Sequence, residues 1–134
     1  MARLFAIEEI TEDQEARLRS LGISSLHGLL TAASTKKKRE RLAKKSGVPE
    51  RKILEWVILA ELMQVCGVGE TAAILLRDAG VTSIEQLAQN RGNNLFGKLQ
   101  EVNNRKGLFR RVPSERVLRK WISRARRMES VLEG

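Results

Sequence analysis

The residues best suited to chemistry in this chain are cations, and they gather in two blocks. The 134 residues carry 25 Lys and Arg against 16 Asp and Glu, a net charge of +9. Residues 36–52 hold nine basic and two acidic side chains, and residues 91–134 hold twelve basic and four acidic ones. The segments 1–35 and 53–90 are net acidic. Such an excess of positive charge predicts attraction to a polyanion more than it predicts any fold.

The cations that we expect to contact a polyanion or a partner lie on two predicted helices and in the loop before the second. No aromatic side chain interleaves with them for base stacking, so contact with nucleic acid is expected to be backbone-directed. If the two blocks lie on the same side, they form one footprint; the alternative is that they are the solvated faces of helices. The predicted contact residues are Lys37, Lys38, Arg41, Lys44, Lys45, Arg105, Lys106, Arg110, Arg111, Arg116, Lys120, Arg124 and Arg127.

A second candidate site is the turn Gly67-Val68-Gly69, which separates two apolar helical stretches. Two glycines suit a tight turn with uncovered amides, and the following helix start favours an anion such as a nucleic-acid phosphate. Gly67, Val68, Gly69 and Thr71 are the residues that would contact it. Glu70 opposes this role, because a carboxylate about 4 Å from a phosphate costs about 1 kcal/mol in water and about 4 kcal/mol at an effective dielectric constant of about 20. We therefore interpret the turn mainly as a packing device.

Catalytic and metal chemistry have little support in the sequence. His27 is the only histidine, and no cysteine or carboxylate cluster stands at metal-ligand spacing from it, so a capping or surface role is expected. Cys66 has no evident histidine partner and is expected to be a small buried residue. We expect no catalytic residue, no metal site and no cofactor, and hence a protein that is not an enzyme.

The elements that position these residues are all expected to be helices. Tyrosine is absent and aromatic residues make up 4% of the chain, whereas strands favour aromatic side chains. Thr11 and Gln14 predict a capping box at the start of the first helix. Apolar residues at three- and four-residue steps predict three more helices, which begin at Ser24, Thr35 and Pro49.

The second half of the chain repeats the first, which predicts an internal duplication. The pattern L-x-x-L-G-I-x-x-L-x-x-L from Leu18 recurs 58 residues later as L-x-x-A-G-V-x-x-I-x-x-L from Leu76. The predicted halves, 1–63 and 64–134, each hold four helices and pack as one compact unit, and only the second keeps the glycine turn. Predicted caps in the second half are Thr82 with Glu85, Asn93 and Gly107, and the predicted buried residues of the last helix are Val117, Leu118, Trp121, Ile122, Ala125 and Met128. Trp56 and Trp121 are the expected core anchors of the halves.

These residues together resemble a known family. The Gly67-Val68-Gly69 turn with Ala73 and Leu76, the run A-G-V-T-S-I-x-x-L, the two tryptophans and the run L-x-x-V-N from Leu99 resemble a domain family of unknown function. The resemblance covers nearly the whole chain. It implies an all-α, tandem helix-hairpin-helix (SAM-like) bundle of two pseudo-repeats with about eight helices. Its hairpin is similar to those of DNA ligases, repair nucleases and the C-terminal domain of the RNA polymerase alpha subunit. It implies no activity.

Two functions follow as expectations. The first is a small basic protein that binds the phosphate backbone of DNA or RNA with low sequence specificity. The alternative is an adaptor or assembly module whose basic faces dock an acidic protein partner or complex. No apolar run is long enough to span a bilayer and no signal peptide is evident, so a membrane partner is not expected and the cytoplasm is the default compartment.

Overall fold

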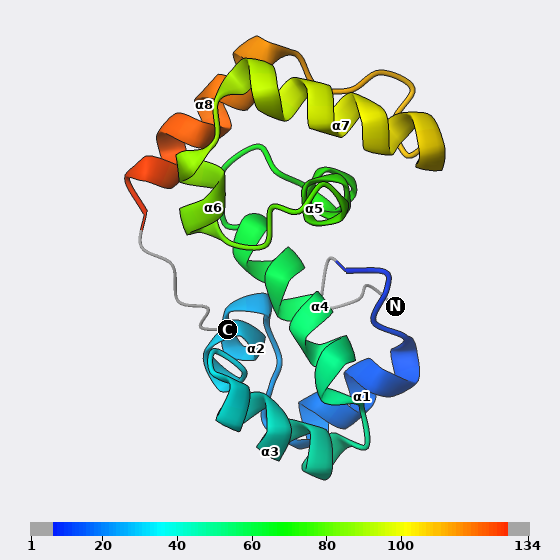
Figure 1. Cartoon of the computed structure of the whole chain (residues 1–134). Coiled ribbons are helices and arrows are strands. Elements are labelled where there is room, and N and C mark those ends of the chain that lie inside the picture. Colours follow the sequence, from blue (N-terminus) through cyan, green and yellow to red (C-terminus); the bar gives the residue numbers. More distant parts are fainter. Residues whose placement is uncertain (1–6, 129–134) are drawn as a thin grey trace. The chain divides into compact units, whose positions relative to one another are not determined.

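The computed structural model describes residues 7–128, and within that range it is all-helical with eight helices and no strand (Figure 1). The predicted all-α class is therefore confirmed for these residues. None of the described helices has the length and apolar character needed to cross a membrane. The helices are α1 (Glu12–Ser20), α2 (Leu26–Ala32), α3 (Lys36–Ser46), α4 (Glu50–Leu62), α5 (Glu70–Asp78), α6 (Ile84–Gln89), α7 (Gly92–Lys106) and α8 (Glu115–Arg126).

The described residues fall into two compact units that divide between Glu61 and Leu62. Four helices begin in each unit, α1 to α4 in the first and α5 to α8 in the second. The halves 1–63 and 64–134 stay a prediction, and their outer ends, residues 1–6 and 129–134, lie outside the described part of the chain.

In the first unit, α1 and α2 both pack against α3. Leu18 of α1 and Leu29 and Leu30 of α2 are fully buried. The long helix α4 contributes Ile53 and Trp56, which are also fully buried, because its apolar residues recur at helical spacing. Trp56 thus lies in the core, as expected.

In the second unit, α8 packs against both α6 and α7, and α5 packs against α7. Four apolar residues of α8 are buried as predicted, namely Leu118, Trp121, Ile122 and Ala125. Val117, at the edge of the buried stripe of α8, is only half-buried, and so is Met128, which lies two residues past the end of the helix. This amphipathic pattern leaves the basic residues of α8 on its outer side.

Helix starts are set by short polar side chains, and their prediction was correct at Thr11 and Thr35 but shifted by one residue at α2 and α6. Thr11 and Gln14 form the complete capping box. The cap of α2 is Ser25, which accepts from the Gly28 N–H, and not Ser24. The cap of α6 is likewise Ser83 and not Thr82. Adjacent hydroxyl residues offer two registers, and the packing of the helix selects one of them.

The start of α7 was predicted at the wrong residue. Asn93 lies inside the helix, whose N-cap is Arg91, with no side-chain hydrogen bond to the first turn. Gly92 is buried as the first helical residue, because the Cγ of Arg119 lies 2.7 Å from where its Cβ would be. The predicted end of α7 is correct, since Gly107 adopts a left-handed conformation and its N–H donates to the Asn103 carbonyl.

The ends of α1 and α5 have the same backbone geometry. The N–H of Ile23 donates to the Leu18 carbonyl at 2.9 Å, and the N–H of Val81 donates to the Leu76 carbonyl at the same distance. A left-handed glycine precedes each donor, Gly22 with φ +87° and Gly80 with φ +92°. Both ends are thus Schellman motifs. They occupy equivalent positions of the predicted repeat, whereas the duplication itself stays a prediction.

Candidate polyanion-binding surfaces

The orientation of α3 is fixed by one buried arginine. Arg39 is 1% exposed. Its Nε lies 3.0 Å from Oε1 of Glu50 at the start of α4, and its Nη1 donates to the Ala33 carbonyl at the end of α2, also at 3.0 Å. Leu42 and Ser46 lie on the same buried face at helical spacing. Arg39 was not among the predicted functional residues, although its position three residues before Leu42 places it on that face.

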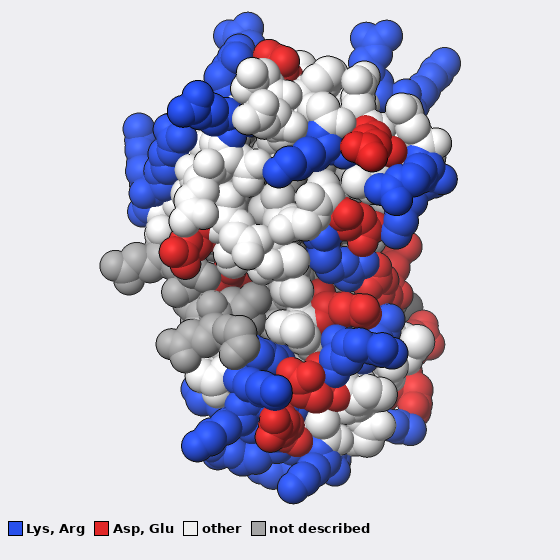
Figure 2. All heavy atoms as spheres, viewed as in Figure 1, with Lys and Arg blue, Asp and Glu red and all other residues white. Residues whose placement is uncertain are grey.

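The opposite side of α3 carries cations that serve no internal contact. Four of them are exposed and make no ion pair within residues 7–128, and we call them the α3 surface: Lys37, Arg41, Lys44 and Lys45. Lys38 is also exposed, but its ammonium lies 3.4 Å from the Thr31 carbonyl and 3.5 Å from the Ser34 hydroxyl. In Figure 2 blue side chains gather where α3 lies in Figure 1. Of the five cations predicted on this helix, four are free to contact a ligand.

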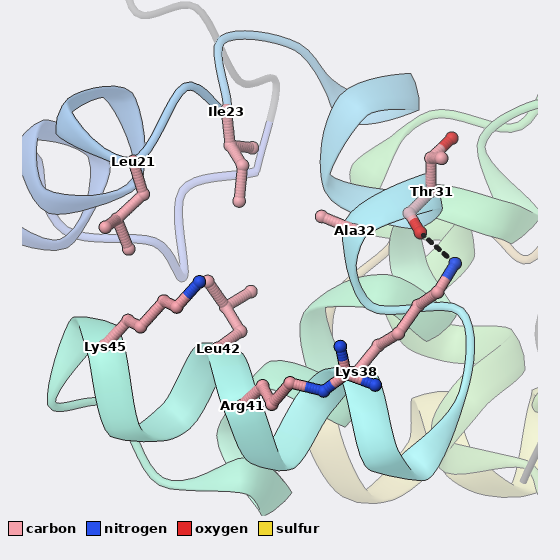
Figure 3. Close-up of a pocket in the computed structure, with 8 residues that line it drawn as sticks. All are labelled: Leu21, Ile23, Thr31, Ala32, Lys38, Arg41, Leu42 and Lys45. Atoms are coloured by element: carbon pink, nitrogen blue, oxygen red, sulfur yellow. Dashed lines mark hydrogen bonds between the residues drawn. The ribbon is translucent and has the colours of Figure 1, made fainter.

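A groove lies beside this surface, within the first unit (Figure 3). Leu21 and Ile23 point toward Leu42 of α3 across it. Its volume is about 410 Å³, within the range of ligand pockets. The residues that line it are Leu21, Ile23, Thr31, Ala32, Lys38, Arg41, Leu42 and Lys45. The groove therefore combines an apolar floor with three cations. The groove was not predicted, because its apolar residues come from three separate segments.

In the second unit, a side-chain amide fixes the basic loop after α7. The Asn103 amide makes two hydrogen bonds to the backbone of Phe109, accepting from its N–H at 2.9 Å and donating to its carbonyl at 3.0 Å. Arg110 and Arg111 follow directly and are exposed. Lys106, also predicted as a contact residue, is held by Asp78 of α5 at 2.6 Å. The loop is thus tied back to the bundle at two points.

The cations of α8 divide into free and committed ones. The Nη1 of Arg124 donates to the Cys66 carbonyl at 2.6 Å, and the Nε of Arg126 donates to the Ala88 carbonyl at 3.1 Å. Arg119 lies 3.7 Å from Glu115. The remaining exposed cations make no ion pair in the described part of the unit, and we call them the loop–α8 surface: Arg105, Arg110, Arg111, Arg116, Lys120 and Arg127.

A polar pocket between α6 and α7 was not predicted. It has a volume of about 570 Å³ and is lined by amides and two cations: Gln86, Gln89, Asn90, Arg91, Asn94 and Lys98. Arg91 and Lys98 make no ion pair among residues 62–128. The run of polar residues from Gln89 to Asn94 is the sequence signal for it. Amides and cations together can donate several hydrogen bonds to an anionic, oxygen-rich ligand.

The Gly67 turn packs directly against α8. Gly67 has φ +96°, and a Cβ there would lie 3.0 Å from Nε1 of Trp121, so this position requires glycine. Gly69 is extended and is the N-cap of α5, with no side-chain hydrogen bond. Val68 is buried, whereas Cys66 is exposed. The prediction of a buried Cys66 was therefore wrong, because Val65 and Val68 occupy the buried positions of this turn.

The start of α5 borders an apolar pocket of about 340 Å³. Gly69, Glu70 and Thr71 line it together with Phe109 and Trp121. Arg124 lies beside the turn, with its Nη1 3.4 Å from where a Gly67 Cβ would be. The same Nη1 is engaged by the Cys66 carbonyl. The phosphate contact of Gly67, Val68, Gly69 and Thr71 stays a prediction.

Within residues 7–128 no group of three or more His, Cys, Asp or Glu side chains is arranged to hold a metal ion. His27 is exposed on α2, in line with the surface role expected for it.

A comparison with protein families gave a match that covers most of the chain. The model of a family described as a domain of unknown function (DUF4332) matches residues 8–128. Searches of the curated proteins and of the solved structures gave no match.

Proposed function

We propose that this chain, which belongs to the domain-of-unknown-function family DUF4332, is a non-enzymatic protein that binds the phosphate backbone of nucleic acid with low sequence specificity. One observation carries the proposal. Four exposed cations on an 11-residue helix have no acidic partner inside the described part of their unit, while the inner face of the same helix is fixed by a buried arginine.

Free cations matter because an ion pair inside the protein must be broken before its cation can bind a phosphate. Lys37, Arg41 and Lys44 follow one another at four- and three-residue steps, so they lie about 6 Å and about 4.5 Å apart along the axis of α3. A row of this kind can follow a phosphate backbone without reading bases. Each neutralised phosphate releases counterions, which makes the affinity depend strongly on salt.

The second unit offers further contacts of the same kind. The loop–α8 surface adds six free cations, and the pocket between α6 and α7 adds amide donors near Arg91 and Lys98. We include in this proposal the assignment of the Gly67 turn as a helix-hairpin-helix motif, with Arg124 as the cation beside it. A cytoplasmic location, expected from the sequence, fits this function.

The experiment is a salt titration of binding to short duplex DNA, duplex RNA and single-stranded RNA. Contact with about six phosphates predicts that the affinity falls about a thousandfold between about 50 and 200 mM salt. Mixed-sequence duplexes of different composition should bind within about twofold of one another, because backbone contacts carry no base information. Absence of binding at low salt, or an affinity that does not change with salt, would refute the proposal.

An acidic protein partner is a second candidate function, and the groove of the first unit is the observation that favours it. The apolar floor made by Leu21, Ile23 and Leu42 offers no favourable contact to a charged phosphate backbone. A peptide, in contrast, can bury an apolar side chain there. The nucleic-acid and protein candidates share Arg41 and Lys45, so they are best separated by variants that leave the cations in place.

A further inference from the structure

The groove of the first unit has the composition of a peptide-docking site. Ile23 and Leu42 form a nearly buried floor, each 6% exposed, and Leu21 is one of only two large hydrophobic residues exposed in the described chain. Leu21 is the C-cap of α1, so its side chain is held at the edge of the groove by the end of that helix. Burial of exposed apolar surface favours an occupant with an apolar side chain.

The rim of the groove sets the charge of that occupant. Lys38, Arg41 and Lys45 all line it, and no acidic residue does. The Lys38 ammonium lies 3.4 Å from the Thr31 carbonyl (Figure 3) and 3.5 Å from the Ser34 hydroxyl, which leaves one of its three N–H donors for a ligand. Arg41 and Lys45 make no ion pair within the described part of the unit. Three cations around an apolar floor are complementary to carboxylates placed around an apolar anchor.

We propose that this groove docks an acidic amphipathic segment of a protein partner, which inserts an apolar side chain between Leu21, Ile23 and Leu42 and sets carboxylates against Lys38, Arg41 and Lys45. The inference deepens the second candidate function and does not depend on nucleic-acid binding. Residues 7–128 contain no strand whose edge could receive an added strand, so the segment is expected to bind as a helix with anchors at positions i and i+4.

Other occupants fit the groove less well. The lining has no aromatic residue on which a nucleobase could stack. A second copy of this chain would bring the same cations to the groove and meet charge repulsion. An anionic amphiphile such as laurate shares the chemistry of one carboxylate and an apolar chain, but it offers a single charge to three cations. The measurements below distinguish the proposed peptide from laurate and from a second copy of the chain.

The test uses the full chain and two fluorescein-labelled peptides of about 15 residues, long enough for a helix to form on binding. Both peptides are rich in Glu and have the same net charge; one carries Leu at positions i and i+4, and the other carries Ser there. The Leu peptide is expected to bind at least about tenfold more tightly. It should also shift the methyl NMR signals of Leu21, Ile23 and Leu42. Equal affinity, or methyl shifts confined to other residues, would overturn the proposal.

Leu21→Asp is the decisive variant, and Leu108→Asp is its matched control. The two leucines are equally exposed, at 38%, so both changes add the same charge at similar cost to stability, and Leu108 lies in the second unit. Leu21→Asp should weaken the affinity for the Leu peptide at least about tenfold. Leu108→Asp should change this affinity by less than about twofold. Equal loss in both variants would overturn the proposal.

Two further measurements identify a wrong occupant. Tighter binding of laurate than of the Leu peptide, with shifts of the same methyl signals, would overturn the proposal in favour of a small amphiphile. A concentration-dependent dimer in sedimentation velocity that Leu21→Asp abolishes would overturn it in favour of self-association. Duplex DNA binding should fall by a similar factor, less than about threefold, in both leucine variants, because each retains every cation and adds one carboxylate. The two proposals can therefore fail separately.

Discussion

The α3 surface and the loop–α8 surface carry similar charge but are built differently. On α3 the inward Arg39 is buried in a network with Glu50 and the Ala33 carbonyl, and the outward cations are free. On α8 some of the outward-facing cations are engaged within the protein, because Arg124 and Arg126 each donate a hydrogen bond to a backbone carbonyl of a neighbouring segment. Two of the seven cations of α3, Lys38 and Arg39, make internal contacts, whereas three of the five cations of α8 do, Arg119, Arg124 and Arg126. Net charge therefore overstates the ligand-binding capacity of α8 more than that of α3.

A basic block contains structural cations, which make contacts inside the protein, and available cations, which do not. These two groups must be separated before a function is assigned to the block. Of the thirteen predicted contact residues, Lys38, Lys106 and Arg124 make hydrogen bonds or ion pairs within their own unit. The other ten are exposed and make no ion pair in the described chain. Substitutions can test this division, because loss of a structural cation changes stability and loss of an available one changes binding.

The largest expected effect is that of Arg39→Ala. It removes a nearly fully buried side chain, and it leaves the Ala33 carbonyl without its donor and Glu50, whose side chain is 28% exposed, without its partner. Loss of these hydrogen bonds should destabilise the protein by about 2–3 kcal/mol. Chemical denaturation of the full chain measures the free energy of unfolding. Lys44→Ala is the matched control on the same helix and should stay within about 0.5 kcal/mol of the original chain. A small effect at Arg39 would contradict the structural role assigned to it.

A smaller effect is expected at the turn against which α8 packs. Gly67→Ala places a side chain at a left-handed position and against Nε1 of Trp121, so it should cost about 1–2 kcal/mol from the backbone conformation alone. Gly69→Ala is the internal comparison, because that residue is extended and a Cβ there meets nothing within 4 Å. Its cost should not exceed about 1 kcal/mol. Equal costs at the two glycines would contradict the left-handed conformation of Gly67.

The smallest effect separates two arginines of α8. Arg124→Ala removes the hydrogen bond to the Cys66 carbonyl and should destabilise the protein by about 1 kcal/mol. Arg127→Ala should leave stability unchanged within about 0.5 kcal/mol but reduce the salt dependence of nucleic-acid binding by about one phosphate contact. Denaturation and salt titration of both variants provide the measurements. A loss of stability in Arg127→Ala without one in Arg124→Ala would refute the distinction between structural and available cations at this helix.

The fold was largely predictable because its signals are local. Capping residues, left-handed glycines and apolar spacing placed all eight helices, and the buried tryptophans were identified from the same spacing. Local signals failed where two neighbouring residues offer the same chemistry, as at Ser24 and Ser25. They also failed at Arg91, which caps α7 without any side-chain hydrogen bond, because the tight contact of Gly92 with Arg119 lies between distant segments.

The candidate sites were predictable only as a list of residue types. The sequence identified which cations lie on outward helical faces, but not which of them reach a carbonyl or a carboxylate of another element. The partner of Arg124 lies 58 residues away and that of Lys106 lies 28 residues away. The groove was missed for the same reason, because Leu21 and Leu42 approach one another only when α1 packs against α3.

The most direct test of the central claim compares two triple variants with the same net charge in one salt titration of duplex DNA binding. Lys37→Ala, Arg41→Ala and Lys44→Ala remove three free cations, whereas Arg19→Ala, Lys52→Ala and Arg119→Ala remove three that are ion-paired. The free set should reduce the slope of log K against log salt by about 2.7, and the paired set by less than about one. Equal reductions would contradict the claim that free cations, and not the total charge, carry binding.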